Sequence, residues 1–77
     1  MPCHVYILFS SSLNRHYVGI TNDADRRLAQ HLGGETRATA AAKDWKIVWS
    51  TTVSDHAAAR ELEKQVKARG ARRFLSA

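Results

Sequence analysis

The chain has 77 residues, enough for one small domain, and a chain of this size buries only about 60% of its unfolded surface on folding. Twelve lysines and arginines against seven acidic residues give a net charge of +5 at pH 7, which favours a polyanionic partner such as nucleic acid. A hydrophobic fraction of 44% is ordinary for a soluble globular domain. We therefore expect residues 1–77 to form a single globular domain.

The cysteine content and the N-terminal residues bear on the cellular compartment. Cys3 is the only cysteine, so an intramolecular disulfide is excluded and a reducing compartment is expected. The apolar run Val5 to Phe9 is too short for a signal peptide or a membrane span. These features predict a cytoplasmic protein that does not enter the membrane.

The N-terminal segment predicts a β-hairpin. Cys3 to Phe9 is rich in β-branched and aromatic residues and is typical of a buried strand, and Arg15 to Ile20 predicts a second strand. If the intervening turn centres on Ser11-Ser12, Tyr6 lies opposite Tyr17 and both side chains share one face. The other face then carries two apolar pairs, Val5 with Val18 and Cys3 with Ile20.

A helix ending near Leu32 is predicted to follow this hairpin. Asn22 or Asp23 can cap its start, because a short side-chain oxygen accepts from the free amides of the first turn. Gly33-Gly34 supplies a left-handed conformation at its end. An apolar stripe is formed by Ala24, Leu28 and Leu32.

Arg27 and His31 lie four residues apart and therefore on one face of this helix, beside the apolar stripe. They follow a tyrosine on the preceding strand, Tyr17, from which one turn of the chain separates them. This cluster could be a functional site. Alternatively, Arg27 pairs with Asp23 on the helix surface.

The remaining segments complete the fold. Glu35 to Asp44 predicts a mobile loop, and Trp45 to Val53 a third strand with Trp45, Ile47, Trp49, Thr51 and Val53 on one face. Ser54 or Asp55 can cap a second helix that reaches Gly70, with an apolar side made of Ala58, Ala59, Leu62 and Val66. Ala71 to Ala77 can add a short third helix holding Phe74 and Leu75.

The order of these elements is strand, strand, helix, strand, helix, with the short helix at the C-terminus. This order predicts an α+β fold in which helices flank a small, mainly antiparallel three-stranded sheet.

The second predicted helix carries two glutamates at different angles from its apolar side. At about 100° per residue, Glu63 lies roughly 85° from the centre of that side and Glu61 roughly 115°. Glu63 is therefore nearer the boundary, where a side chain can face a cleft between helix and sheet. A surface ion pair from Glu63 to Lys67 is the alternative, worth only about 0.3–0.5 kcal/mol.

Basic residues dominate the chain after Glu63, where no acidic residue follows. They form either a phosphate-contacting face or the solvated end of a helix whose dipole favours cations. With two basic residues of the predicted loop, the candidates for nucleic-acid contact are Arg37, Lys43, Lys64, Lys67, Arg69, Arg72 and Arg73.

Four short motifs occur along the chain: V-Y-I-L at Val5 to Leu8, Y-V-G at Tyr17 to Gly19, R-x-x-x-H at Arg27 to His31, and E-K-Q-V-K at Glu63 to Lys67. In order, spacing and predicted element, the set resembles the GIY-YIG nuclease superfamily, most closely its small single-domain bacterial members. The resemblance covers nearly the whole chain. His4 replaces the glycine of the first motif, and Ile20 stands where some members have a lysine.

The resemblance implies a divalent-metal-dependent endonuclease domain, using Mg²⁺ or Mn²⁺, that hydrolyses phosphodiester bonds. By position, Tyr6 and Tyr17 are the tyrosines of the first two motifs, and Arg27 matches the catalytic arginine. His31 matches a tyrosine-or-histidine position, and Glu63 the metal-binding glutamate.

The general base is either Tyr17, which we favour, or His31. A tyrosine with a pKa near 10 is ionised to only about one part in a thousand at pH 7, so Tyr17 needs a neighbour that lowers its pKa. His31 is the better intrinsic proton acceptor, or it hydrogen-bonds Tyr6 or Tyr17.

Three candidate functions are consistent with the sequence. The leading one is an endonuclease acting on DNA rather than RNA, with little sequence specificity, because no helix-turn-helix or zinc finger accompanies the domain. The second is a non-catalytic nucleic-acid-binding domain that retains the fold and the charge. The third is a small interaction module in which the tyrosines pack and Glu63 pairs with Lys67. No pattern indicates an oligomeric state.

Overall fold

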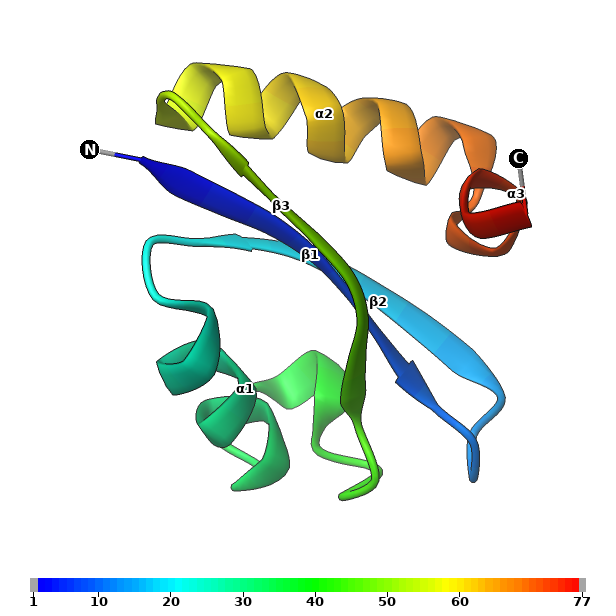
Figure 1. Ribbon diagram of the computed structural model, residues 1–77. Helices are drawn as coiled ribbons and strands as arrows, with labels where there is room; N and C mark the ends of the chain where they lie inside the picture. Colours follow the sequence, from blue (N-terminus) through cyan, green and yellow to red (C-terminus); the bar gives the residue numbers. More distant parts are fainter. Residues whose placement is uncertain (1, 77) are drawn as a thin grey trace.

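The computed structural model describes residues 2–76 and contains a single sheet with helices on both faces (Figure 1). The elements, in chain order, are β1 (Cys3–Ser10), β2 (Arg15–Thr21), α1 (Ala24–Leu32), a short 3₁₀ helix (Arg37–Thr39), β3 (Lys46–Val53), α2 (His56–Arg69) and α3 (Ala71–Ser76). The sheet order is β2-β1-β3, and both pairings are antiparallel. The predicted α+β fold is confirmed. Of the predicted third helix, Ala77 lies outside the described residues.

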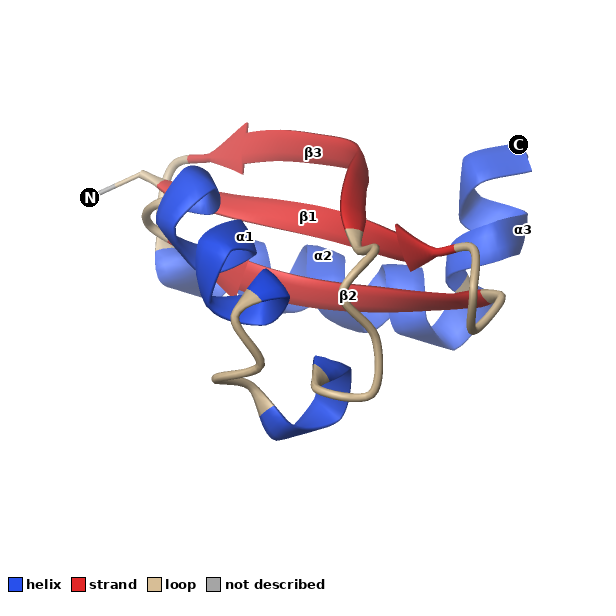
Figure 2. Cartoon of the chain, turned by 90° about the horizontal axis from the view of Figure 1, so that it is seen from below, coloured by secondary structure: helices blue, strands red, loops and turns tan. Residues whose placement is uncertain are grey.

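The sheet separates two small apolar cores. Figure 2 shows α1 and the following loop on one face and α2 on the other, with α3 at the end where the β1–β2 turn lies. The face toward α2 carries Val5 and Ile7, which pack with Ala59 and Val66. The face toward α1 carries Tyr6 and Leu8, which pack with Ala42 and Trp45 and with partly buried leucines of α1. Because β1 is central, its side chains are buried on both faces.

The register of the β1–β2 hairpin differs by two residues from the prediction. Tyr6 lies opposite Gly19, and Tyr17 lies opposite Leu8, so the predicted direct pairing of the two tyrosines is wrong. The turn occupies residues 11–14 and uses a left-handed Asn14 with φ of 51°, a conformation that asparagine tolerates. A shift of two residues preserves the faces, so both tyrosines still lie on the α1 side. The observed apolar pairs are Val5 with Ile20 and Ile7 with Val18.

Asp44 holds this longer turn in place. Its carboxylate accepts hydrogen bonds from the Ser10 hydroxyl at 2.6 Å, the Ser11 hydroxyl at 3.0 Å and the Ser12 amide at 2.9 Å. These bonds hold the pKa of Asp44 well below its ordinary value, and the bond from Ser10 has the largest effect. The turn register is thus fixed by a residue distant in sequence, which a local turn rule does not include.

β3 contains a bulge that the prediction for the third strand did not include. Ile7 pairs with Trp49 but Leu8 pairs with Ile47, so the register shifts between them and Val48 is left 39% exposed. Trp45 and Ile47 consequently join the α1-side core, whereas Trp49 and Val53 join the α2-side core. The predicted single face from Trp45 to Val53 is wrong, because a strict period of two cannot continue through a bulge.

The two long helices start at the predicted caps. The side chain of Asp23 accepts from the Arg26 amide at 3.1 Å, and that of Asp55 accepts from the Ala58 amide at 2.8 Å. At the end of α1, Gly34 is left-handed with φ of 76°, whereas Gly33 keeps a helical φ of −79°, so only the second glycine plays the predicted role.

The predicted apolar side of α2 is largely confirmed. Ala59 and Val66 are buried and Leu62 is half-buried, but Ala58 is exposed. No helix within residues 2–76 has the length and hydropathy needed to cross a bilayer.

The loop between α1 and β3 is packed onto the domain. Thr39, in its 3₁₀ helix, is completely buried, and the Trp45 indole donates to the Thr39 carbonyl at 2.8 Å. Ala42 is also buried against Tyr6 and Leu8. The predicted loop is thus partly ordered into a helical turn that closes the α1-side core.

Gly19 is the position of β2 most sensitive to added volume. A β-carbon built there would collide with the hydroxyl and ring of Tyr6, which is only 2% exposed. We expect Gly19→Ala to lower the free energy of unfolding by about 1–3 kcal/mol, because the buried ring must shift. Urea unfolding checks this. Ser50→Ala, on the other neighbour of Tyr6, is the control and should have little effect. Equal stability of wild type and Gly19→Ala would contradict the account.

Candidate functional site

A chain of buried hydrogen bonds connects β1, α1 and the loop. The Tyr6 hydroxyl lies 2.9 Å from His31 Nε2, and His31 Nδ1 lies 2.7 Å from Thr39 Oγ1. Thr39 Oγ1 in turn donates to the Thr36 carbonyl at 3.4 Å. Because the Thr39 proton is used there, its oxygen accepts from Nδ1–H, and the other imidazole nitrogen accepts from Tyr6. The pattern therefore assigns a neutral His31 protonated at Nδ1.

Burial explains this protonation state. His31 and Thr39 have no exposed surface. Burial lowers the pKa of His31, and the positive charge of Arg27 lowers it further. His31 thus receives a hydrogen bond from Tyr6 while remaining out of contact with solvent.

Tyr17 stands beside this chain and is more accessible. Its ring centre lies 4.8 Å from that of His31 and 6.4 Å from that of Tyr6. Tyr17 is half-buried, and it lines a surface hollow together with Lys67 and Arg72. Of the two tyrosines, Tyr17 is therefore the more accessible, since Tyr6 is only 2% exposed.

Arg27 lies close to both tyrosines. Hydrogen bonding to Tyr6 is the main cause that raises the pKa of Arg27, and Tyr17 adds to it. The guanidinium also donates to Gln30 Oε1 at 2.9 Å, which orients it from the next turn of α1. The alternative partner, Asp23, caps the helix instead and forms no ion pair with Arg27 among the described residues.

The pKa of the Tyr6 hydroxyl depends on its burial and on neighbouring charges. Burial is the largest influence and raises the pKa of its hydroxyl, whereas the hydrogen bond to Arg27 opposes the rise. Tyr17 and Glu63 each raise this pKa further. The helix that carries Glu63, α2, packs on the opposite face of the sheet from Tyr6.

Glu63 also forms the ion pair that the sequence offered as its alternative role. Its carboxylate lies 3.4 Å from Lys67 Nζ, and the Glu63 side chain is 25% exposed. The ion pair with Lys67 is therefore observed, whereas the orientation of Glu63 toward the cleft stays a prediction.

A metal ion at this position would have few protein ligands. No group of three or more histidine, cysteine or acidic side chains gathers for metal binding within residues 2–76. Mg²⁺ is commonly held by one or two carboxylates, with water and substrate phosphate completing its shell. The partly exposed Glu63 carboxylate is a single ligand of that kind.

The structure brings together only some of the basic candidates. Arg69, Arg72 and Arg73 line one hollow with Ser76, while Lys67 and Arg72 line the hollow that contains Tyr17. Arg72 also donates to Asn14 Oδ1 at 3.2 Å. Arg37, Lys43 and Lys64 are exposed but line neither hollow.

Two residues of this region were missed by sequence reasoning. Thr39 sits in a loop without periodicity, and its role depends on the loop folding back onto His31. Gln30 could have been suggested by its spacing of three residues from Arg27, which is contact distance on a helix.

The buried His31 makes stability depend on pH. Its pKa is lowered in the folded state, so the unfolded chain binds more protons once the pH falls below about 6.5. We expect the melting temperature to fall as the pH drops from 7 toward 5, and His31→Gln to reduce this dependence. His16, whose pKa is lowered by burial and by Arg72, contributes with the same sign.

Calorimetry across this pH range checks the prediction. His56→Gln, on the exposed start of α2, is the matched control and should retain the wild-type dependence. An unchanged pH dependence in His31→Gln would contradict a neutral, buried imidazole.

Comparison with known proteins gives the relationship of this chain. A family model described as the GIY-YIG catalytic domain matches residues 2–74. A UPF0213 protein of Klebsiella pneumoniae is 36% identical over 66 residues, covering 84% of this chain and 62% of that protein. A UPF0213 protein of Vibrio cholerae is 39% identical over 69 residues, covering 87% of this chain and 67% of that protein. The chain thus spans 62–67% of the length of these relatives.

A solved structure agrees with the fold. The UPF0213 protein from Bacillus halodurans, determined by solution NMR, is similar with a TM-score of 0.59 and 27% identity. The match covers 99% of this chain and 81% of that one. The arrangement of sheet, helices and site residues described above is therefore found in a chain that belongs to the GIY-YIG catalytic domain family.

Proposed function

We propose that this domain is a divalent-metal-dependent endonuclease that hydrolyses phosphodiester bonds in DNA. The observation that carries the proposal is the convergence of Tyr6, Tyr17, Arg27 and His31 from three elements. Hydrolysis needs a bound phosphate, an aligned water and compensation of the charge that develops on oxygen. We assign the binding of the phosphate, the alignment of the water and the compensation of charge to these side chains.

Arg27 is the proposed phosphate ligand. Its guanidinium is always charged, presents a planar fork of donors, and is held by a hydrogen bond to Gln30. Negative charge growing on the non-bridging oxygens is then stabilised by a group already in place. A Mg²⁺ or Mn²⁺ ion held by Glu63 would add charge neutralisation at the phosphate when bound.

Tyr17 is the proposed residue for the attacking water. It is more exposed than Tyr6, and it hydrogen-bonds to Arg27. His31 cannot contact a water in the site, because it is completely buried and both ring nitrogens are occupied. In this assignment His31 fixes the Tyr6 hydroxyl, and Tyr6 supports Arg27.

DNA contacts beyond the scissile phosphate are assigned to the exposed basic residues. Lys67 and Arg72 border the hollow beside Tyr17, and Arg69 and Arg73 continue from it. Such contacts are independent of sequence, so we expect little base specificity from them. A non-catalytic DNA-binding domain is the second candidate, favoured by the Glu63–Lys67 ion pair, which occupies the proposed metal ligand.

A plasmid-nicking assay with Mg²⁺ or EDTA separates these functions. We expect Mg²⁺-dependent nicking by wild type, and a loss of about 100-fold or more in Arg27→Ala and in Glu63→Gln, because each removes charge stabilisation at the phosphate. Arg60→Ala and Glu61→Gln, on the exposed side of α2, are matched controls that should nick like wild type.

Two results would overturn the nuclease assignment. One is nicking by Arg27→Ala and Glu63→Gln at the wild-type rate. The other is salt-dependent DNA binding without nicking by wild type, which would instead support the non-catalytic candidate.

A further inference from the structure

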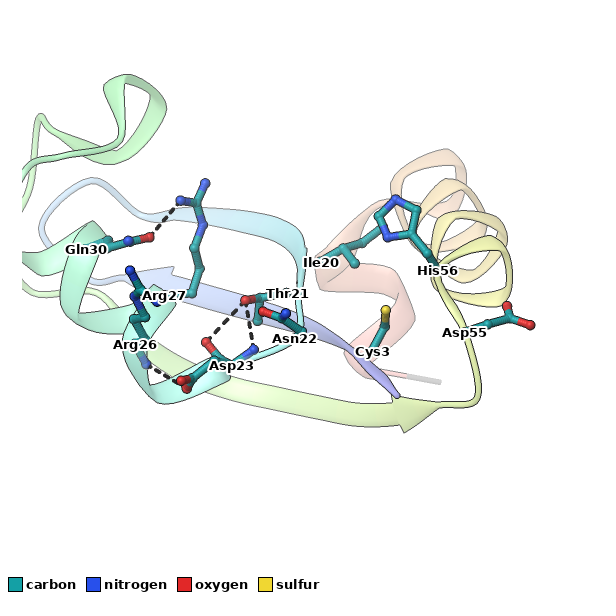
Figure 3. Close-up of a pocket in the computed structure, with 10 residues that line it drawn as sticks. All are labelled: Cys3, Ile20, Thr21, Asn22, Asp23, Arg26, Arg27, Gln30, Asp55 and His56. Atoms are coloured by element: carbon teal, nitrogen blue, oxygen red, sulfur yellow. Dashed lines mark hydrogen bonds between the residues drawn. The ribbon is translucent and has the colours of Figure 1, made fainter. Parts of the chain in front are cut away.

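A cavity of about 610 Å³ lies between the starts of α1 and α2, next to the proposed phosphate site (Figure 3). Cys3 and Ile20 contribute its apolar side, and Asn22 lies between them and α1. Gln30 and Arg27 line it from α1, and His56 lines it from the first turn of α2. Of the residues that line this cavity, only Arg27 and Gln30 have a role in the chemistry proposed above.

The chemistry of the lining suits a neutral, planar, polar ring. Ile20 supplies apolar surface, the Asn22 and Gln30 amides supply donors and acceptors, and the His56 imidazole supplies a ring for stacking. Small-molecule sites of this kind combine apolar walls with a few polar groups in volumes of about 300–1,000 Å³. A heterocyclic base has these properties.

The charges of the cavity are balanced, which argues against a second phosphate site. Arg26 and Arg27 line it, but so do Asp23 and Asp55. Both carboxylates cap helix starts, through the Arg26 amide and the Ala58 amide, and so occupy the amides that would otherwise receive an anion. The hollows around Arg69 to Arg73 have no such acidic residues.

Arg27 is shared by the cavity and the tyrosine site. Its guanidinium interacts with Tyr6 and Tyr17, and its side chain also lines the cavity beside Gln30 (Figure 3). A phosphate bound to Arg27 therefore lies at the mouth of the cavity, and the nucleoside attached to that phosphate lies within reach of its interior.

We propose that this cavity binds the base of the nucleotide that adjoins the phosphate held by Arg27. The inference rests on the proposed function for the position of that phosphate. It adds a base-binding subsite lined by Ile20, Asn22 and His56. Discrimination between bases, where it exists, then comes from the Asn22 and Gln30 amides.

NMR titration of the full chain with deoxyadenosine 5′-monophosphate tests the subsite without requiring cleavage. We expect shifts of the Ile20, Thr21, Asn22 and His56 amides. Deoxyribose 5-phosphate and inorganic phosphate should shift only the surroundings of Arg27. His56→Ala should lower the affinity for the nucleotide about tenfold, since stacking on one aromatic ring contributes that much. Asn22→Ala should weaken it as well, and His4→Ala, at a histidine outside the cavity, is the matched control.

The outcomes separate the two proposals. Equal shifts with the nucleotide and with deoxyribose 5-phosphate would overturn the subsite, as would nucleotide shifts confined to residues 69–73. If the nucleotide binds in the cavity but wild type does not nick plasmid DNA, the subsite stands and the catalytic assignment fails. If wild type nicks DNA and the nucleotide leaves the cavity amides unshifted, only the subsite fails.

Discussion

The hydrogen-bonded chain from Tyr6 through His31 to Thr39 is the interaction on which the α1 side of the molecule depends. It links the central strand, the first helix and the loop before β3 in one buried line. Buried polar groups are costly unless every one is paired, so these segments must pack together for both of these bonds to form. Among the described residues no buried side-chain donor or acceptor is left without a partner.

This chain also explains why the site has an inner and an outer part. Tyr6 and His31 are buried and hold each other, whereas Tyr17, Arg27 and Glu63 keep exposed surface. Gly19 makes the arrangement possible, because the Tyr6 ring passes over a position where no side chain intervenes. Tyr6 and His31 thereby help to position Tyr17, through ring contacts, and Arg27, through its hydrogen bond to Tyr6.

Sequence predicted the parts of the fold that depend on local signals. The Asp23 and Asp55 caps, the glycine after α1 and the hydrophobic strand β1 all follow from short-range rules. The predicted hairpin register was wrong because Asp44, far along the chain, fixes the turn. The predicted single face of β3 was wrong because a bulge interrupts its alternation. Thr39 was missed for the same reason, since its partner His31 is reached only through the folded loop.

Mn²⁺-induced broadening of amide resonances tests the proposal that Glu63 holds a divalent ion near Tyr17 and Arg27. Paramagnetic Mn²⁺ should broaden the signals of Glu63, Tyr17 and Arg27 first. The effect should disappear in Glu63→Gln and persist in Glu61→Gln. Broadening centred elsewhere, or unchanged in Glu63→Gln, would contradict the account.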